Sequence, residues 1–304
     1  MGILMKILCL GSLNLDHVYQ VNHIVQPGET TTSHSFNIID GGKGMNQALA
    51  LGRANANCYM AGMIGQDGIH LIKSLEESHI NADYVTVSED NLTGHTIIQV
   101  DQNGQNSIIC YAGANHMIDE VFVNKVLAQF EPGDFILLQN EINNIPFIIE
   151  QAKNKGMKIA FNPSPITKQL LNYPLDLVDL LLLNEIEGYE LTKEKNYEDI
   201  LKKLHLIYPK TSIVLTLGKN GALFSDGVNV YQHGIYDVNV VDTTAAGDTF
   251  TGYFLSAYAD NEPIQECLRK ASIASSLAVS RAGASTSIPF LTEVLNSNLV
   301  LINI

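Results

Sequence analysis

Cysteines are few in this sequence, and none of them stands close to another. The four thiols belong to Cys9, Cys58, Cys110 and Cys267, without a C-x-x-C pair, and the nine histidines form no H-E-x-x-H motif. Because structural zinc sites need such closely spaced ligands, none is expected here. Widely spaced cysteines are instead typical of reduced thiols buried in a cytoplasmic protein.

Long apolar runs and an excess of positive charge are also missing. The N-terminal segment MGILMKILCLG is interrupted by Lys6, and the run LLLL at 180–183 is bounded by Asp179 and Asn184, so no segment has the length of a membrane span. The formal net charge is −14, from 32 acidic and 18 basic residues, which repels nucleic acid and anionic membranes. We therefore expect a cytoplasmic protein that binds neither of them.

The pattern of apolar residues predicts an α/β fold. Hydrophobic residues make up 46% of the 304 positions, which is enough for a large core. The N-terminal part reads as a strand ending near Leu10, a helix at 46–54 and a strand at 58–65; further on come a helix at 119–130, a strand at 135–139, a helix at 145–155 and strands at 158–162, 180–184 and 212–216. Short apolar strands separated by helices indicate a mostly parallel sheet with helices on both faces.

Two segments predict extended structure outside this core. Residues 12–40 contain a Pro-Gly turn signal at 27–28, and residues 94–111 alternate apolar and polar positions around an Asn-Gly turn signal at 103–104. Together they predict a small second sheet whose exposed face covers something or pairs with another subunit. We expect it to act as a lid.

Polar residues follow several of the predicted strands of the core. They are Asn14, Glu141, Asn162, Asn184 and Thr216. Because ligands of parallel sheets bind at the carboxyl ends of the strands, these residues are expected to lie near one site.

The segment DTTAAGDTFTGYFLSAY at 242–258 carries the strongest chemical signal. Small residues lead into an apolar helix, so the free N–H groups of Ala246 and Gly247 would lie at the positive end of the helix dipole and bind an anion. Asp248, in the first turn, would lie where a carboxylate can accept a proton from an attacking hydroxyl. Taken alone, the same residues equally fit ordinary helix capping.

Two further glycine-rich segments are weaker signals when taken singly. GGKGMNQ at 41–47 opens a helix and contains Lys43 and Asn46, but it lacks the spacing of a Walker A loop and fits tight packing as well. TLGKNG at 216–221 is most simply a hairpin turn between two strands.

In combination, these motifs resemble the ribokinase or PfkB family of carbohydrate kinases, from about Lys6 to Pro289. Both family signatures are present, GGKGMNQALALGRANANCYMAGMIGQDG and DTTAAGDTFTGYF. The shorter motifs GSLNLD, PGET, AGAN, NPSP, NEIEGYELT and TLGKNG occur as well. Their joint occurrence outweighs the capping, packing and hairpin explanations of the single segments.

The resemblance implies roles for individual residues. Asp248 would be the catalytic base that deprotonates the sugar's primary hydroxyl, and Ala245, Ala246 and Gly247 would form the anion hole. The implied sugar-binding residues are Asn14, Asp16, Gly42, Lys43, Gly44, Asn46, Glu141 and Asp248. The implied ATP-binding residues are Asn184, Thr216, Leu217, Gly218, Lys219, Asn220, Gly221, Gly247 and Ser272, with Mg²⁺ arriving on the nucleotide. An activating K⁺ would bind at Asp242, Thr244, Ala278, Arg281, Gly283 and Ser287.

The implied activity is ATP-dependent phosphorylation of D-ribose at the 5-hydroxyl, giving ribose 5-phosphate. One kinase domain over residues 1–304 would carry a lid formed by about 12–40 and 94–111, and the lids of two subunits would pair in a homodimer. The N-x-D motif at 14–16, together with GGKGMN at 41–46, favours a free pentose over deoxyribose, a ketohexose or a nucleoside. A non-catalytic sugar-binding regulator is the alternative outside enzymes, but a pure binder has no need of a base at Asp248.

Two positions depart from the family pattern. Asp40 precedes the two glycines, where a small or apolar residue is more usual, and it either alters sugar preference or faces solvent. Ser272 replaces the usual His or Asn near the adenine, which would loosen adenine stacking without abolishing ATP binding.

Overall fold

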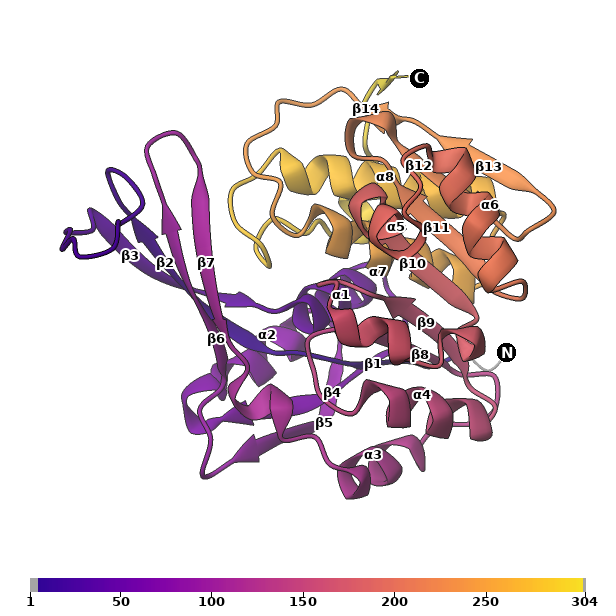
Figure 1. Ribbon diagram of the computed structural model, residues 1–304, viewed down its shortest axis with the longest axis horizontal. Helices are drawn as coiled ribbons and strands as arrows, with labels where there is room; N and C mark the ends of the chain where they lie inside the picture. The colour runs from indigo at the N-terminus through magenta and orange to yellow at the C-terminus, as the bar shows by residue number, and fades with distance from the viewer. Residues whose placement is uncertain (1–4, 303–304) are drawn as a thin grey trace.

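The computed structural model describes residues 5–302, and its main body is a nine-stranded sheet with helices on both faces (Figure 1). The strand order is β13-β12-β11-β10-β9-β8-β1-β4-β5, and only the pairings of β12 with β11 and β13 are antiparallel. The strands are β1 Ile7–Leu10, β4 Cys58–Gly65, β5 Asn81–Ser88, β8 Phe135–Gln139, β9 Lys158–Asn162, β10 Leu180–Asn184, β11 Ser212–Thr216, β12 Ala222–Ser225 and β13 Val230–His233. The predicted α/β fold with a mostly parallel sheet is confirmed.

The central strands are buried on both faces because helices cover the sheet from both sides. Every residue of β1 and β8 is buried, which explains why these strands read as continuous apolar runs rather than alternating patterns. One face packs against α1 Lys43–Arg53, α2 His70–Glu77, α7 Ala246–Ala259, α8 Ile264–Val279 and α9 Leu291–Leu295. The other packs against α3 Glu120–Leu127, α4 Ile145–Asn154 and α6 Tyr197–Ile207, with α5 Glu185–Thr192 beside α6.

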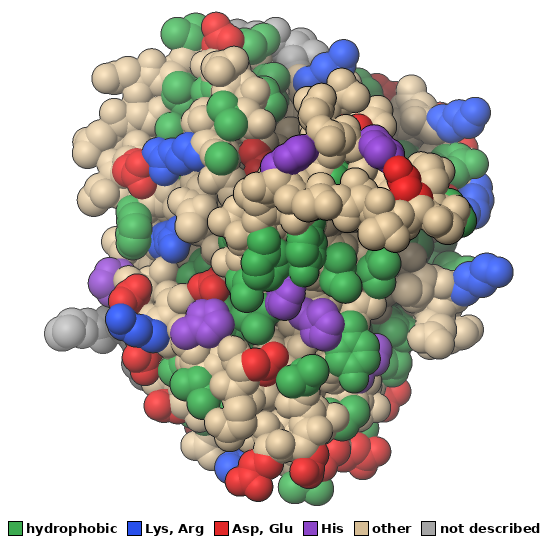
Figure 2. Space-filling model, turned by 90° about the vertical axis from the view of Figure 1, so that its left-hand side faces the viewer, with side chains coloured by type: hydrophobic (Ala, Val, Ile, Leu, Met, Phe, Trp, Pro, Cys, Tyr) green, Lys and Arg blue, Asp and Glu red, His purple; other side chains and the backbone are tan. Residues whose placement is uncertain are grey.

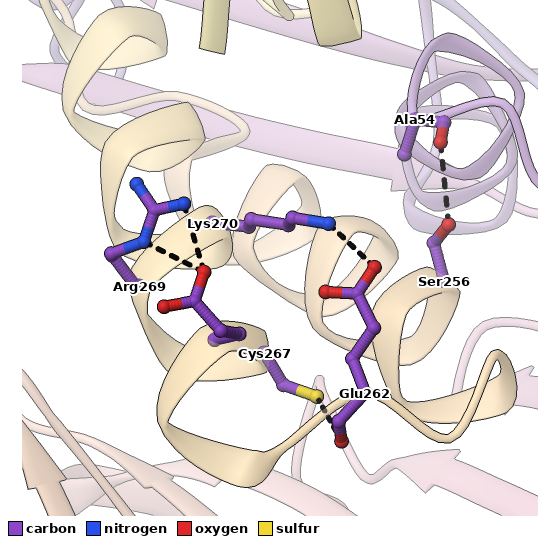
Figure 3. A network of polar contacts seen from close by, with 7 residues as sticks. Ala54, Ser256, Glu262, Cys267, Arg269 and Lys270 are labelled. Carbon is purple, nitrogen blue, oxygen red and sulfur yellow. Dashed lines mark hydrogen bonds and ion pairs between the residues drawn. The ribbon is translucent and has the colours of Figure 1, made fainter. Parts of the chain in front are cut away.

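Helices α1 and α7 cross closely, which places their N-termini side by side. A Cβ atom on Gly252 of α7 would lie 2.4 Å from Cβ of Ala50 of α1, so only glycine permits this approach. At the far end of the crossing, Ser256 Oγ donates to the Ala54 carbonyl at 3.4 Å (Figure 3). The turn between α7 and α8 is held by the ion pair of Lys270 with Glu262, whose carbonyl also accepts from the Cys267 thiol (Figure 3).

A second sheet of four strands projects from the main body (Figure 1). Its order is β3-β2-β6-β7, and we call it the small sheet: β2 Asn14–Gln20, β3 Ser35–Gly41, β6 Gly94–Val100 and β7 Asn106–Tyr111. The hairpin expected at 94–111 is confirmed by the antiparallel pairing of β6 with β7. The small sheet therefore arises from the two segments that the sequence separated from the core.

The structure also contains elements that the periodicity did not predict. They include α2, α5, α6, β5, β12, β13 and a short pair formed by β14 Ile235–Tyr236 and β15 Leu301–Ile302. The hairpin explanation of TLGKNG is correct, since β11 and β12 are antiparallel and this segment joins them. Among the described residues, no helix is long and apolar enough to cross a membrane.

Candidate active site

The first turn of α7 lies beside a cavity at the carboxyl edge of the main sheet. The cavity measures about 220 Å³ and is lined by Asn162, Asn184 and Thr216 from three strand ends, together with Lys43 and Asp248. The expectation that polar strand ends meet near one site thus holds for these three strands. Ligands of parallel sheets bind at this edge because the strand ends and helix N-termini converge there.

The chain turns sharply before α7, which exposes the start of the helix. Ala245 has a left-handed backbone, with φ 59°, and α7 begins at the next residue. Gly247 is exposed, and a Cβ atom placed on it would meet nothing within 4 Å, so a ligand can approach its backbone. The N–H of Ala246 donates to the Thr243 carbonyl at 3.3 Å, so this predicted anion-hole donor is engaged in a long hydrogen bond.

Asp248 is a buried carboxylate held by two amide side chains of α1. Gln47 Nε2 donates to its Oδ1 at 2.9 Å, and Asn46 Nδ2 donates to its Oδ2 at 3.3 Å. Asp248 is 7% exposed, and Asn46 is 6% exposed with a buried Oδ1 that has no partner in the structure. A buried acceptor without a donor is costly, so this oxygen is a point at which a ligand hydroxyl would bind.

Lys43, which lines this cavity, lies near two carboxylates, those of Asp248 and Glu141. The Asp248 carboxylate, followed by Glu141, raises the pKa of Lys43, which keeps its ammonium group protonated. Glu141 accepts from Ser12 Oγ at 2.6 Å and from the Lys43 backbone N–H at 2.9 Å, at the N-terminus of α1. Burial raises the pKa of Glu141, and the Lys43 charge opposes that shift.

The small sheet contributes Asn14 and Asp16 to the same region. Asn14 Oδ1 accepts from Asn115 Nδ2 at 2.8 Å, and Asp16 Oδ1 accepts from Thr96 Oγ1 at 2.6 Å. Burial raises the pKa of Asp16, against the lowering effect of the Thr96 hydrogen bond. A Cβ atom on Gly41 would lie 2.1 Å from Asp16 Oδ2, so the glycine leaves room for this carboxylate.

The glycines after Gly41 connect these two halves of the site. Gly42 has φ +90°, and a Cβ there would lie 3.2 Å from the Asn14 nitrogen. The N–H of Gly44 is already engaged with Ser12 Oγ at 3.1 Å, and its carbonyl accepts from the Cys9 thiol. Gly44 therefore packs α1 against the end of β1.

The predicted nucleotide residues border two further cavities that adjoin the first. One, of about 130 Å³, is lined by Thr216, Gly218, Gly221, Gly247 and Ser272. The other, of about 390 Å³, is lined by Gly218 and Lys219 with apolar residues such as Ile235 and Val279. All three cavities are lined by Ala246 at the start of α7. The two further cavities together form a partly apolar groove beside the one that Asp248 lines.

Three of the predicted nucleotide residues also hold the local fold. Asn184 caps α5 through a hydrogen bond from the Glu187 N–H at 2.9 Å, which leaves its amide NH₂ for other partners. Leu217 is 4% exposed, and its backbone N–H donates to the Gly221 carbonyl. The Asn220 N–H donates to the Leu217 carbonyl, so the turn between β11 and β12 is closed by its own backbone.

The segments expected to bind potassium lie side by side. Asp242 Oδ1 accepts from the Thr244 N–H at 2.9 Å and from its hydroxyl, and Oδ2 accepts from the Gly283 N–H at 3.0 Å. Burial alone would raise the pKa of Asp242, but these hydrogen bonds outweigh it and lower the pKa. The backbone N–H groups of 241 and 242 also donate to the Val279 carbonyl, which ties this loop to the end of α8.

The other predicted potassium ligands are engaged locally. The Ala278 carbonyl accepts from the Arg281 N–H at 3.1 Å, and the buried Ser287 hydroxyl donates to the Ala284 carbonyl at 2.8 Å. The Arg281 guanidinium pairs with Glu293. In the described part of the chain, no cluster of three or more His, Cys, Asp or Glu side chains is placed to hold a metal ion.

Asp40 has a structural role that the sequence did not reveal. Its Oδ2 accepts from Ser74 Oγ at 2.6 Å, and its Oδ1 lies 3.3 Å from His70 Nε2, so it links β3 to α2. Because Asp16 pairs with Ile39, the next residue, Asp40, lies on the opposite face of the small sheet. It faces away from Asp16 and the sugar-binding residues beside it.

Sequence reasoning missed several residues that complete the site. Gln47 and Gln139 extend the hydrogen bonding of Asp248, Thr96 and Asn115 hold the small-sheet side chains, and Ser12 holds Glu141. The signals in the sequence were the positions of Gln47 in GGKGMNQ, Ser12 in GSLNLD and Asn115 in AGAN, all motifs of the family resemblance. The partners of the others are far apart in the chain, so no local pattern indicates them.

Known proteins resemble this chain over nearly its whole length. Residues 5–291 match the model of the pfkB family carbohydrate kinases. A ribokinase from Haemophilus influenzae is 34% identical over 300 residues, covering 94% of this chain and 96% of its own, and one from Staphylococcus aureus is 36% identical over 302 residues, covering 95% and 98%. The structure of Arabidopsis thaliana ribokinase complexed with ribose and ATP superposes with a TM-score of 0.85 at 29% identity, covering 96% of this chain and 98% of that one.

Proposed function

The chain belongs to the pfkB family of carbohydrate kinases, and we propose that it transfers the terminal phosphoryl group of ATP to the 5-hydroxyl of D-ribose, giving ribose 5-phosphate. It is a phosphotransferase with an alcohol group as acceptor. The observation that carries the choice of a sugar is the buried Asn46 Oδ1, which lacks a donor and lies next to the Asp248 carboxylate. A hydroxyl-rich ligand satisfies such a group.

Asp248 acts as the general base in this proposal. Its carboxylate accepts the proton of the sugar hydroxyl, the hydroxyl oxygen forms a bond to the γ-phosphorus, and the bond from that phosphorus to the bridging oxygen breaks, releasing ADP. The backbone N–H groups at the start of α7, from Ala245 to Gly247, face the transferred group, where the helix dipole favours negative charge. The N–H of Ala246 has to leave the Thr243 carbonyl to contribute, which a bound phosphate would favour.

Sugar and nucleotide occupy opposite sides of Asp248. Asn14, Asp16, Lys43, Asn46 and Glu141 bind the sugar hydroxyls, and the groove between the β11–β12 turn and Ser272 of α8 binds the nucleotide. The carboxylate of Glu187 and the amide of Asn162, whose Nδ2 donates to the Leu182 carbonyl, border the cavity with oxygen donors of the kind that suits the Mg²⁺ carried by ATP. When bound, Mg²⁺ neutralises charge on the phosphate oxygens. The free, widely spaced thiols support a location in the cytoplasm.

The direct test is a coupled ADP-release assay with a panel of acceptors. We expect the highest kcat/KM with D-ribose and lower values with deoxyribose, fructose and nucleosides, because a lost hydroxyl leaves polar groups of the site unpaired. If a nucleoside or a ketohexose were the best substrate, that compound and not ribose would be the acceptor. Binding of sugar without ADP release would favour the regulator instead.

We further propose that the small sheet is a lid and that two copies pair through its outer face. Asp16 and Thr96 point to the inner face, so Phe36, Ile38, Ile97, Ile109 and Tyr111 point outward, and each of these is at least 40% exposed. Figure 2 looks onto this side of the molecule, where hydrophobic and histidine side chains gather. An exposed face that carries several large apolar side chains is typical of a subunit interface.

Substituting Ile109→Glu is expected to convert the dimer into monomers, because a carboxylate would be buried in the apolar interface. Ile109 is 63% exposed in the single chain, so the substitution should leave the fold of the subunit intact. Light scattering measures the mass, and Val228→Glu, at a side chain that is 90% exposed on the main body, is the matched control. A monomeric wild-type protein would contradict the proposed dimer.

Potassium is expected to raise kcat by about 10-fold or more over sodium, because it would order the loop that aims the anion-hole donors. An ion bound between the loop at 242–244 and the loop at 281–287 would join the two segments that Asp242 already brings together. Rates should be compared in potassium, sodium and large organic cations at constant ionic strength. Equal rates with all three kinds of cation would contradict the proposed cation site but not the proposed kinase activity.

A further inference from the structure

A chain of two buried glutamines runs from the Asp248 carboxylate into the core. Gln47 Nε2 donates to Asp248 Oδ1 at 2.9 Å, and Gln47 Oε1 accepts from Gln139 Nε2 at 2.8 Å. Gln47 lies on α1 and is 0% exposed, while Gln139 is the last residue of β8 and is 1% exposed. Three elements, α7, α1 and β8, are therefore connected through side chains alone.

The chemistry of the carboxylate determines which way both amides face. An ionised carboxylate only accepts hydrogen bonds, so Gln47 must turn its NH₂ group toward Asp248. Its carbonyl oxygen then faces Gln139, which must in turn present its own NH₂ group. Reversing either amide would bring two oxygens or two NH₂ groups together, so each orientation depends on the next.

The surrounding backbone leaves space for this chain. A Cβ atom on Gly11 would lie 2.1 Å from Gln139 Oε1, so any other residue at this position would displace the second amide. Burying primary amides costs free energy unless their groups are hydrogen-bonded, and Gln139 Oε1 remains without a partner. Two apolar side chains would fill this part of the core at lower cost, so packing does not account for the glutamines.

The two oxygens of Asp248 are held unequally. Oδ1 has the shorter hydrogen bond, from Gln47, and Oδ2 has only the 3.3 Å contact with Asn46, on the side of the unpartnered Asn46 Oδ1. A carboxylate that can rotate would offer the reacting hydroxyl an oxygen in varying directions. Holding Oδ1 also fixes the direction of Oδ2, on the side of the unpartnered Asn46 Oδ1.

We propose that Gln47 is a positioning residue, oriented by Gln139, that fixes the Asp248 carboxylate so that Oδ2 receives the proton of the acceptor hydroxyl. This proposal rests on the proposed kinase function. It assigns Gln47 no contact with either substrate, because the residue reaches the reaction only through Asp248. The expected effects therefore fall on kcat and on its pH dependence rather than on substrate affinity.

Gln47→Glu tests the hydrogen bond to Asp248 with almost no change in shape. A second carboxylate oxygen would lie where the amide nitrogen now lies, 2.9 Å from Asp248 Oδ1, while Gln139 could still donate to the other oxygen. Two carboxylates at this separation share a proton, so the acidic limb of the pH–kcat profile should move upward by about one pH unit or more. The limb moves to higher pH because Asp248 accepts a proton only when it is ionised, and in the variant the shared proton is lost only at higher pH.

Gln47→Met removes the hydrogen bond without adding charge. We expect kcat to fall by about 10-fold with the KM values for sugar and ATP nearly unchanged, since a mobile carboxylate spends less time in the reactive direction. Gln129→Glu, an exposed glutamine after α3, adds the same charge as Gln47→Glu far from the site and should leave the profile in place. Melting temperatures of all variants report whether the fold is kept.

A readout that does not depend on activity separates this proposal from the kinase proposal. In protein labelled with ¹³C at the aspartate carboxyl carbon, the Asp248 signal is identified by its loss in Asp248→Asn, and its titration should move to higher pH in Gln47→Glu. Unchanged titration of that signal would overturn the positioning role even if the kinase is active. Absence of ADP release from the wild-type protein with every acceptor would instead overturn the function, while the titration still decides the role of Gln47.

Discussion

Replacing Asp248 by asparagine is expected to lower kcat by about 10²- to 10⁴-fold, the usual range for removal of a general base. The asparagine has the same shape, and its oxygen can still accept from Gln47 Nε2, so the start of α7 should stay in place. Asn46 can turn its unpartnered Oδ1 toward the new NH₂ group, which avoids a clash of two donors. What is lost is the ability to take up the proton of the acceptor.

The measurement is steady-state ADP release together with calorimetric titration of ATP. Affinity for ATP should stay within a few-fold of the wild-type value, because the groove beside Ser272 is unchanged. Asp260→Asn, at the exposed C-terminal end of the same helix, is the matched control and should keep full turnover. Near-normal turnover in Asp248→Asn would contradict the role of the Asp248 carboxylate as the general base.

Asp16→Ala is expected to weaken the affinity for the sugar by about 10- to 100-fold and to leave ATP binding unchanged, because a hydrogen bond to a charged group contributes about 1.5–3 kcal/mol. The carboxylate is held for this role: Thr96 Oγ1 donates to Oδ1 at 2.6 Å, and the missing side chain of Gly41 leaves Oδ2 free. Asp16 lies on the small sheet, away from the groove between the β11–β12 turn and α8.

Calorimetry with ribose and with ATP separates the two affinities. The matched control is Asp40→Ala, since this carboxylate stands on the opposite face of the same sheet and bonds Ser74. It should bind ribose as the wild type does, which would contradict an effect of Asp40 on sugar preference. Unchanged ribose affinity in Asp16→Ala would place the sugar pocket elsewhere.

The strands buried on both faces could be predicted with their boundaries. The strands at 58–65, 135–139, 158–162, 180–184 and 212–216 have the same bounds in the structure as in the sequence pattern. Each is a mostly apolar run, because helices cover both faces of the sheet; the charged Lys158 stands at the exposed first position of its strand.

Elements at the edges escaped prediction for the opposite reason. Strand β5 is an edge strand in which only Ala82 is buried, so its residues show neither an apolar run nor a regular alternation. Helix α5, EIEGYELT, has few apolar residues and is held by the capping box of Asn184 and Glu187. Both of these elements are buried only in part, which leaves a weak period in their sequences.

The sequence by itself predicted the fold class and the two sheets, because binary patterning is a local property of the chain, and it indicated the polar residues proposed for the site through strand ends, glycine-rich helix starts and the family resemblance. The partners of those residues depend on contacts across long sequence separations. Gln47 lies 201 residues from Asp248 and 92 from Gln139, and Asp40 reaches Ser74 across 34 residues. Only the tertiary structure decided which oxygen of Asp248 has the shorter hydrogen bond, at 2.9 Å from Gln47, and which has the longer one, at 3.3 Å from Asn46, because packing brings these groups together from separate parts of the chain.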